Sequence, residues 1–344
     1  MLSIRQGVPE GLLDADPGML AELLGGPTLF HVPGRNPDPL FVSAMLHGNE
    51  PAGLRALQGL LTGYRNEGLP RALSVFIGNV EAARWGKRFL AGQPDYNRIW
   101  CPGRGAEHEM TQRVLDEMGR FRLFAAIDVH NNTGPNPFYA LVARDSVTHL
   151  QLARGFSQIV VFATYPDSTC TVAFSRICPA VTLEAGMPED RAGVEQARRF
   201  IHECLQLERM RVQPLTNADL YQTVAVVKVS NECSYGFHGE DVVDLEFTEN
   251  LERLNFIELA PGTELAKTRN GCDSCLRVWN NHGMEVGKHY LNTDERGVVR
   301  TVRKVMPAML TLDREIIRMD CLCYLMERKK LNDDSRPFVR EDCE

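Results

Sequence analysis

The sequence has no apolar run long enough to cross a membrane. No stretch of it approaches the roughly 20 consecutive apolar residues that a transmembrane helix requires. The beginning of the chain, MLSIRQGVPEGLLDADPGML, also lacks the basic segment and the apolar segment of a secretory signal. We therefore expect a cytoplasmic protein that has no membrane as a partner.

Excess positive charge is missing as well. The chain carries 38 Lys and Arg residues against 45 Asp and Glu residues, a formal net charge of -7. Proteins that bind nucleic acids usually present a basic surface to the phosphate groups, so no nucleic acid is expected as a partner. The sequence also contains no Gly-x-Ser-x-Gly motif, and this absence disfavours a serine esterase.

The ten cysteines do not form the dense pattern of a disulfide-stabilised secreted domain. In a chain of 344 residues without an export signal, we interpret them as reduced thiols. A structural zinc site is the alternative for one group, whose members are Cys272, Cys275, His282, His289, Cys321 and Cys323. Their spacing matches no common zinc finger, so thiols in a β-rich region are the better interpretation.

Strand-like and helix-like segments alternate over the first two thirds of the chain. Apolar runs bounded by turn residues predict buried strands over 40–46, 72–80, 124–129, 138–143, 159–163 and 180–183. Apolar residues at helical spacing predict helices over 51–64, 107–122 and 188–208. This alternation favours an α/β fold in which helices flank a mixed, largely parallel sheet.

The pattern changes after about residue 210. The segments 224–229 and 298–312 are rich in β-branched and apolar residues, and helical periodicity is scarce there. We therefore predict two domains, an α/β domain over 1–210 and a smaller β-rich domain over 211–344.

Two histidines and a glutamate stand directly after predicted strands. The turn His47-Gly-Asn-Glu50 follows the first of these strands, and His130 follows the strand over 124–129. A catalytic zinc ion takes three protein ligands and keeps one position open, and two His with one Glu is a common set. Ligand sites in open α/β sheets form at the carboxyl ends of strands. A His-x-x-Glu pair also arises by chance, so the shared strand-end position and the third ligand are what favour a metal site.

Two acids have positions that suit supporting roles at such a site. Glu184 ends the apolar run AVTL, and a carboxylate beside an activated water can accept its proton and later protonate a leaving amine. Asp128 precedes His130 by two positions, so both side chains point to the same side of a strand. Asp128 can then orient the imidazole. The alternative for each acid is a purely structural residue.

The loop Asp95-Tyr-Asn-Arg98 supplies a candidate for carboxylate binding. Arg98 can pair with a carboxylate through two parallel hydrogen bonds, and Asn97 can add an amide donor. Arg88, upstream in the same region, is a second cation. Taken alone, either arginine is better explained as a solvent-exposed charge or as a partner of a nearby acid.

Four segments together resemble the aspartoacylase and succinylglutamate desuccinylase family, which belongs with the zinc carboxypeptidases. They are HGNE (47–50), DYNR (95–98), DVHNNTG (128–134) and TLEAG (182–186), in the family's order. NFIELAPGTELA (255–266) is similar to a segment near the family's C-terminal β domain. The resemblance implies the zinc carboxypeptidase-like α/β fold with a smaller C-terminal β domain.

The resemblance also implies roles for individual residues. One zinc ion per subunit would bind His47, Glu50 and His130, and Glu184 would act as general base and general acid. Zinc-promoted attack of water on the amide carbonyl is the implied mechanism.

Substrate-binding roles follow from the same resemblance. Asn97 and Arg98 are expected to bind a substrate carboxylate, and Arg88 resembles the family's additional substrate-binding arginine. The segment between Arg88 and DYNR is longer here than in aspartoacylases, which weakens that transfer. Arg176 is a further candidate cation for the pocket.

The residues after DVH depart from the characterised deacylases. The segment NNTGPNPFY places its own polar and aromatic side chains beside the metal. Asn131, Asn132 and Tyr139 are therefore expected to line a pocket of different shape, and the family does not identify the substrate.

The sequence thus predicts zinc-dependent hydrolysis of the amide bond of a small, carboxylate-bearing N-acyl amino acid. The alternatives are a metallocarboxypeptidase that acts on peptides and a non-catalytic ligand-binding protein of the same fold. A β domain that narrows the cleft favours small substrates, and the presence of every expected ligand and of Glu184 disfavours a non-catalytic protein. The composition leaves both a monomer and a homo-oligomer open.

Overall fold

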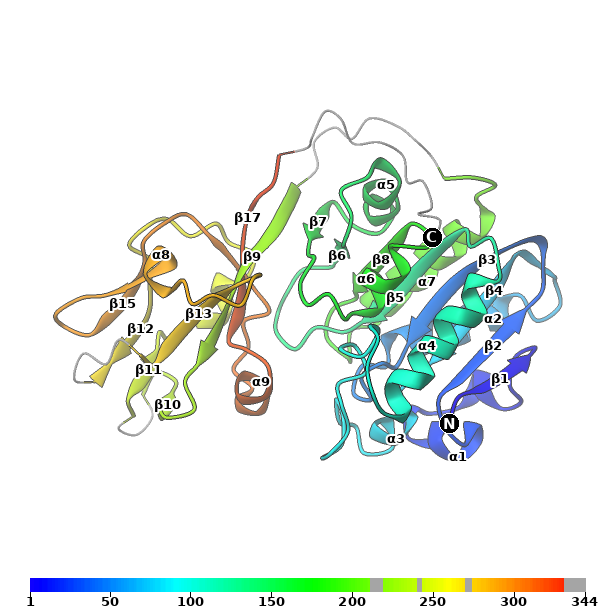
Figure 1. The fold of residues 1–344 in the computed structure, drawn as a ribbon, viewed down its shortest axis with the longest axis horizontal. Helices are drawn as coiled ribbons and strands as arrows, with labels where there is room; N and C mark the ends of the chain where they lie inside the picture. The colour runs from blue at the N-terminus through cyan, green and yellow to red at the C-terminus, as the bar shows by residue number, and fades with distance from the viewer. Residues whose placement is uncertain (211–218, 240–242, 270–273, 331–344) are drawn as a thin grey trace. The chain divides into compact units, whose positions relative to one another are not determined.

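The computed structural model describes residues 1–210, 219–239, 243–269 and 274–330 of the chain (Figure 1). No helix in these described parts is long and apolar enough to cross a membrane. Cys272, a member of the alternative zinc group, lies outside the described residues.

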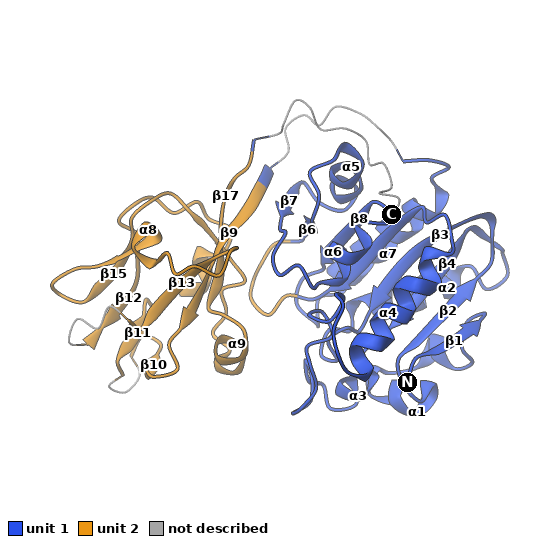
Figure 2. Cartoon of the chain, in the orientation of Figure 1, with its two compact units in different colours: residues 1–131, 138–220, 330–344 blue, residues 132–137, 221–329 orange. Residues whose placement is uncertain are grey.

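The chain forms two units, each with its own hydrophobic core. Unit 1 comprises residues 1–131 and 138–220, and unit 2 comprises residues 132–137 and 221–329 (Figure 2). The predicted domain boundary after residue 210 adjoins residues 211–218, which lie outside the described residues.

Unit 1 is built around a mixed, mostly parallel sheet. Its strands follow the order β1-β2-β4-β3-β5-β8-β6-β7, and neighbours are parallel except at β2–β4 and β8–β6. The strands are β1 (Ser3–Gln6), β2 (Thr28–Val32), β3 (Gly34–Ala44), β4 (Leu69–Ile77), β5 (Ala125–His130), β6 (Tyr139–Val142), β7 (Ile159–Phe162) and β8 (Ala180–Glu184).

Helices cover both faces of this sheet because successive residues of a strand point to opposite sides. On β3, Leu40, Val42 and Ala44 belong to one core with α2, α5 and α7, whereas Phe41 belongs to a second core with α4 and α6. The helices of unit 1 are α1 (Leu20–Leu24), α2 (Ala52–Gly63), α3 (Val80–Ala83), α4 (Ala106–Gly119), α5 (Val147–Phe156), α6 (Cys170–Phe174) and α7 (Arg191–Gln206).

The predicted α/β class, with a mixed, largely parallel sheet and flanking helices, is confirmed. The expected helices appear as α2, α4 and α7, and the strand predicted over 124–129 is β5, which extends to His130. Elements that were not predicted include β2 and α5. Strand β2 is five residues long and contains a polar His31, so its local signal is weak.

Unit 2 is smaller and rich in strands. Strand β9 pairs with β13 and β17, and β17 pairs with β16. A separate five-stranded sheet has the order β10-β11-β12-β15-β14, and residues of both sheets share one core. The elements are β9 (Asp219–Val229), β10 (Tyr235–Gly236), β11 (Leu245–Phe247), β12 (Glu264–Thr268), β13 (Leu276–Asn280), α8 (Gly287–Tyr290), β14 (Leu291–Thr293), β15 (Val298–Thr301), β16 (Met306–Ala308), α9 (Arg314–Met319) and β17 (Cys323–Arg328).

Helix α2 packs closely against the strands that lead to His47 and His130. A Cβ atom on Gly53 would lie 2.8 Å from the Cβ atom of Ala44 on β3 and 2.9 Å from that of Val129 on β5. Glycine at this position therefore lets the helix approach the sheet.

Gly53→Ala is expected to lower the free energy of unfolding by about 1–3 kcal/mol, because the added methyl group overpacks the core. Gly63→Ala is the matched control, since a Cβ atom at this last residue of α2 meets nothing within 4 Å. The control should be neutral or slightly stabilising. Urea unfolding followed by circular dichroism measures both, and equal effects would contradict the close packing.

Candidate active site and metal centre

The tight turn after β3 brings His47 and Glu50 together. The N–H of Glu50 donates to the carbonyl of His47 at 3.2 Å. Gly48 packs against the backbone of α3, because a Cβ atom there would lie 2.2 Å from the nitrogen of Ala83. The N–H of Gly48 donates to the carbonyl of Arg88 at 3.1 Å, which fixes the turn from its other side.

His130 reaches the same place from the end of β5. Strand β5 lies between β3 and β8, and His130 pairs in register with Glu184. The carboxyl ends of three neighbouring parallel strands therefore carry the turn with His47, then His130, then Glu184.

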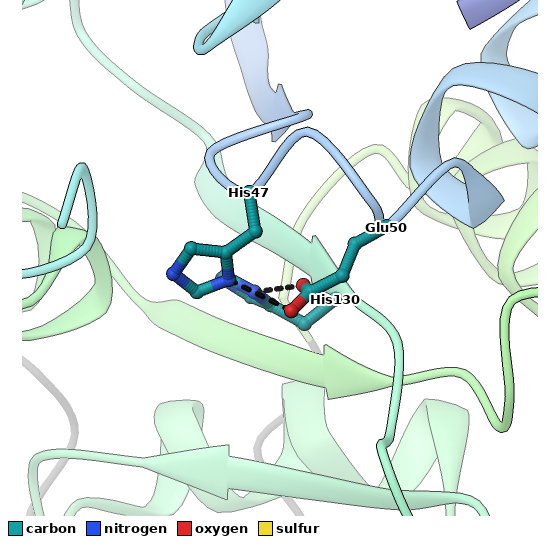
Figure 3. A group of neighbouring side chains, drawn as sticks. All are labelled: His47, Glu50 and His130. Carbon is teal, nitrogen blue, oxygen red and sulfur yellow. Dashed lines mark hydrogen bonds and ion pairs between the residues drawn. The ribbon is translucent and has the colours of Figure 1, made fainter. Parts of the chain in front are cut away.

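The side chains of His47, Glu50 and His130 converge (Figure 3). Nδ1 of His47 lies 2.8 Å from Oε1 of Glu50, and Nδ1 of His130 lies 2.7 Å from Oε2. One ligand atom from each residue lies within 4.8 Å of the others, and all three residues are buried. The three residues singled out from the sequence thus form one cluster.

Each imidazole is held by a second carboxylate on its far side. Nε2 of His47 lies 2.8 Å from Oδ1 of Asp95, and Nε2 of His130 lies 2.8 Å from Oδ2 of Asp128. Metal-binding histidines commonly donate their other ring N–H to a carboxylate, which fixes the ring and its tautomer. Ser43 extends this arrangement, because its hydroxyl donates to Oδ1 of Asp128 at 2.6 Å.

This donor set fits a divalent cation such as zinc. Two imidazole nitrogens and one carboxylate are a standard catalytic zinc set, and the outer carboxylates leave both Nδ1 atoms directed at the centre. Burial raises the pKa of Glu50, but the two imidazoles outweigh it and hold that pKa well below its usual range. Burial lowers the pKa of His130, but Asp128 and Glu50 raise it well above its usual value. Positive charge near Glu50 and Asp128 therefore stabilises these buried carboxylates.

Glu184 lies at the edge of this cluster. It is buried, and its Oε2 has no hydrogen-bond partner among the residues that the structure describes. Its pKa is raised to about 8, chiefly by burial; Glu50 and Asp128 add to the rise, and His130 and Arg88 oppose it. A buried carboxyl group with an unpartnered oxygen and a raised pKa is the pattern of a proton-transfer residue.

Arg88 lies against the same cluster. Its Nη2 donates to Oδ2 of Asp95 at 3.0 Å, and its Nη1 lies 3.5 Å from Oε1 of Glu50. Arg88 is thus held by two acids of the centre, and its guanidinium lies beside the candidate ligands.

Asn97 and Arg98 occupy the loop after α3. The amide oxygen of Asn97 accepts from the N–H of Cys170 at 2.9 Å, and its Nδ2 lies 3.2 Å from Nε2 of His130. Arg98 is half-buried and uses Nη1 to hold the carbonyl of Asn97 at 2.9 Å. Asn97 therefore contacts His130 of the candidate ligand cluster directly, and Arg98 contacts the backbone of Asn97.

The other candidate pocket residues have different surroundings. Tyr139 is buried on β6 opposite Glu184 in the antiparallel register. Asn132 is fully buried, and neither polar atom of its side chain has a partner within the described parts of the chain. Arg176 is exposed after α6. Asn131 is buried, and its amide contacts the backbone of Ala52 and of Gly186.

Asp95 and Ser43 were not predicted to have roles at the site, although Asp95 belongs to the segment DYNR. The sequence signal for Asp95 was its place in the same short loop as Asn97, two positions upstream. Ser43 is one polar residue within the apolar run LFVSAML, and a polar residue in a buried strand needs a partner. The position of Ser43 therefore indicated a buried hydrogen bond, but it did not identify Asp128 as the acceptor.

Solved structures of similar fold were found for most of the chain. A succinylglutamate desuccinylase from Chromobacterium violaceum has 17% sequence identity and a TM-score of 0.58, over 87% of this chain and 86% of its own. Murine aminoacylase 3 has 15% identity and a TM-score of 0.55, over 86% and 97%. A succinylglutamate desuccinylase/aspartoacylase from Rhodobacter sphaeroides has 14% identity and a TM-score of 0.60, over 88% of each chain.

These similarities show that the chain has the fold of the succinylglutamate desuccinylase and aspartoacylase structures. The fold that the four motifs implied is therefore confirmed. Comparison of the sequence with models of known protein families and with curated proteins found no match.

His47→Ala is expected to abolish stoichiometric zinc binding, because it removes one of three ligands and leaves Glu50 and Asp95 without their common partner. Metal content after gel filtration of the zinc-loaded protein measures this. His202→Ala is the control, since His202 on α7 contacts Tyr64 instead of the cluster. Stoichiometric zinc in His47→Ala would show that the ion binds elsewhere.

Proposed function

We propose that this chain is a zinc-dependent hydrolase that cleaves the amide bond of small N-acyl amino acids. One observation carries the proposal: two imidazoles, each oriented by an outer carboxylate, converge on Glu50 beside the buried carboxyl group of Glu184. The similar structures named as desuccinylases and aminoacylases support this choice among zinc hydrolases. The four sequence motifs support it independently.

His47, Glu50 and His130 would hold one zinc ion per subunit. Bound zinc supplies Lewis acidity, which lowers the pKa of water toward about 7 and polarises a carbonyl group. Asp95 and Asp128 keep the two imidazoles in the orientation that binding requires.

Glu184 performs the proton transfers in this proposal. Its unpartnered Oε2 accepts a proton from the attacking water and then delivers it to the nitrogen of the leaving amine. Cationic neighbours favour its carboxylate form, and Arg88 and His130 already act in that direction. Burial and the nearby carboxylates of Glu50 and Asp128 keep the protonated form accessible for the second transfer.

Arg88 would stabilise the negative charge that develops on the carbonyl oxygen. Its guanidinium lies beside Glu50 and is held in place by Asp95. A fixed donor of this kind is worth roughly 2.7–4 kcal/mol in known oxyanion sites, because it needs no reorganisation during the reaction.

Arg98 and Asn97 would bind the carboxylate of the substrate. Arg98 has five N–H donors, and the carbonyl of Asn97 accepts one of them. Tyr139, Asn132 and Arg176 stay predictions as pocket residues, and the buried amide of Asn132 and the ring of Tyr139 opposite Glu184 fit that role better than the exposed Arg176. A cytoplasmic location also stays a prediction.

Zinc-loaded protein should release amine from a panel of N-acetyl and N-succinyl amino acids, measured with a primary-amine assay. Glu184→Gln should keep zinc and lose turnover by about a hundredfold to ten-thousandfold, because it removes the proton acceptor. Glu195→Gln, an exposed change on α7, is the control.

The same panel should include short peptides. Cleavage confined to peptides would favour the metallocarboxypeptidase alternative. Zinc binding without turnover of any compound would favour the non-catalytic alternative. Full activity in Glu184→Gln would remove Glu184 as the base.

Arg98→Lys is expected to raise KM for acyl amino acids about tenfold to hundredfold, because lysine cannot form two parallel bonds to a carboxylate. Substrates whose carboxylate is replaced by a carboxamide should bind weakly to both proteins and show no further loss in the variant. Arg55→Lys, an exposed change on α2, is the control. An equal loss with both substrate types would contradict the assigned contact.

A further inference from the structure

Asn131 joins three segments of the candidate site. It follows His130 at the end of β5 and is 2% exposed. Its amide oxygen accepts from the N–H of Ala52 at 3.0 Å, and its amide nitrogen donates to the carbonyl of Gly186 at 2.9 Å. Both ends of the side chain are thus engaged with backbone groups far away in the sequence.

The bond to Ala52 caps the helix that follows Glu50. The first N–H groups of a helix have no partner inside it, and the N-cap residue of α2 is Pro51, whose side chain accepts no hydrogen bond. Asn131 supplies that acceptor from another strand. The start of α2, and with it the end of the turn that carries Glu50, is therefore tied to β5.

The bond to Gly186 ties the segment after Glu184 to the same residue. Gly186 has φ +73, and a Cβ atom there would lie 2.6 Å from a ring carbon of Phe138. This backbone is confined by its packing, so its carbonyl presents one fixed acceptor to Asn131.

The main chain of Asn131 adds a third contact. Its N–H lies 3.3 Å from Oε2 of Glu50, the oxygen that also faces Nδ1 of His130. One residue therefore touches the ligand Glu50, the helix behind it and the strand end that carries Glu184. The Asn131 side chain was predicted to line the substrate pocket, but both of its polar ends bond to the protein backbone.

We propose that Asn131 is a positioning residue that sets the distance between the metal ligand Glu50 and the proton-transfer residue Glu184. The inference rests on the proposed function for its kinetic consequence. An amide suits this role because it offers one acceptor and one donor in a fixed plane. Neither a carboxylate nor an apolar side chain of similar size offers both.

The test compares Asn131→Ala with Gln58→Ala. Gln58 lies on α2, and its amide nitrogen donates to the backbone carbonyls of Leu12 and Ala15. Its loss therefore also removes two side-chain bonds to the backbone, but outside the site. Both proteins are loaded with Co²⁺, whose visible absorption reports the geometry of the ligands, and kcat and KM are measured with zinc.

Asn131→Ala should lower kcat about tenfold to hundredfold, a typical loss for a group that orients a metal site, with KM changed less than about threefold. Its Co²⁺ spectrum should shift, whereas Gln58→Ala should match the wild type in spectrum and kcat. If Asn131→Ala does not fold, Asn131→Asp serves instead. It keeps the acceptor for Ala52 and loses the donor to Gly186, and it should show the same fall in kcat.

Three results would overturn the proposal. They are a wild-type spectrum with wild-type kcat, an equal loss in Gln58→Ala, and a rise in KM with kcat unchanged, which would place Asn131 against the substrate. A wild-type protein that binds Co²⁺ but cleaves no amide would refute the proposed function alone, because the spectral comparison still tests Asn131.

Discussion

The organisation of unit 1 depends on the charge balance around two buried imidazoles. Glu50, Asp95 and Asp128 surround His47 and His130, and all five residues lie within hydrogen-bonding distance of a neighbour in the group. Acids are rarely buried unless positive charge compensates them. Arg88 supplies part of that charge, and a divalent cation bound between the Nδ1 atoms of the two imidazoles would supply more. The same demand for charge explains why these polar residues gather at one point.

The sheet order makes this gathering feasible. Parallel strands β3, β5 and β8 are neighbours, so their carboxyl ends meet at one edge although long stretches of chain separate them. Gly48 lets the turn approach α3, and Gly53 lets α2 approach the sheet. Asn131 links the start of α2 to the segment after β8 through its bonds to Ala52 and Gly186. A network in which every member has a partner holds side chains more rigidly than isolated bonds do. Rigidity of this kind is what an active site needs for proton transfer at short range.

Much of this could be predicted from the sequence, because it depends on local patterns. Apolar runs ending in His47, His130 and Glu184 located strand ends, and parallel strands place such ends together. The partners of each polar atom could not be predicted in this way. Asp95 binds His47 from a loop, Ser43 binds Asp128 from the neighbouring strand, and Asn131 turns toward the backbone. Each of these contacts depends on register and on the path of a loop, which local patterns do not specify.

The sequence by itself determined the fold class, the candidate ligands and the candidate base, since residue type and strand-end position are properties of short segments. Only the tertiary structure decided which polar side chains contact the candidate ligands, as Asp95 and Asp128 do, and which contact the backbone instead. Asn131 and Asn132 are identical in type and adjacent in the chain, yet one is fully engaged with backbone groups and the other is buried without a described partner. The difference arises because successive residues leaving a strand face different surroundings, and only the packed chain supplies those surroundings.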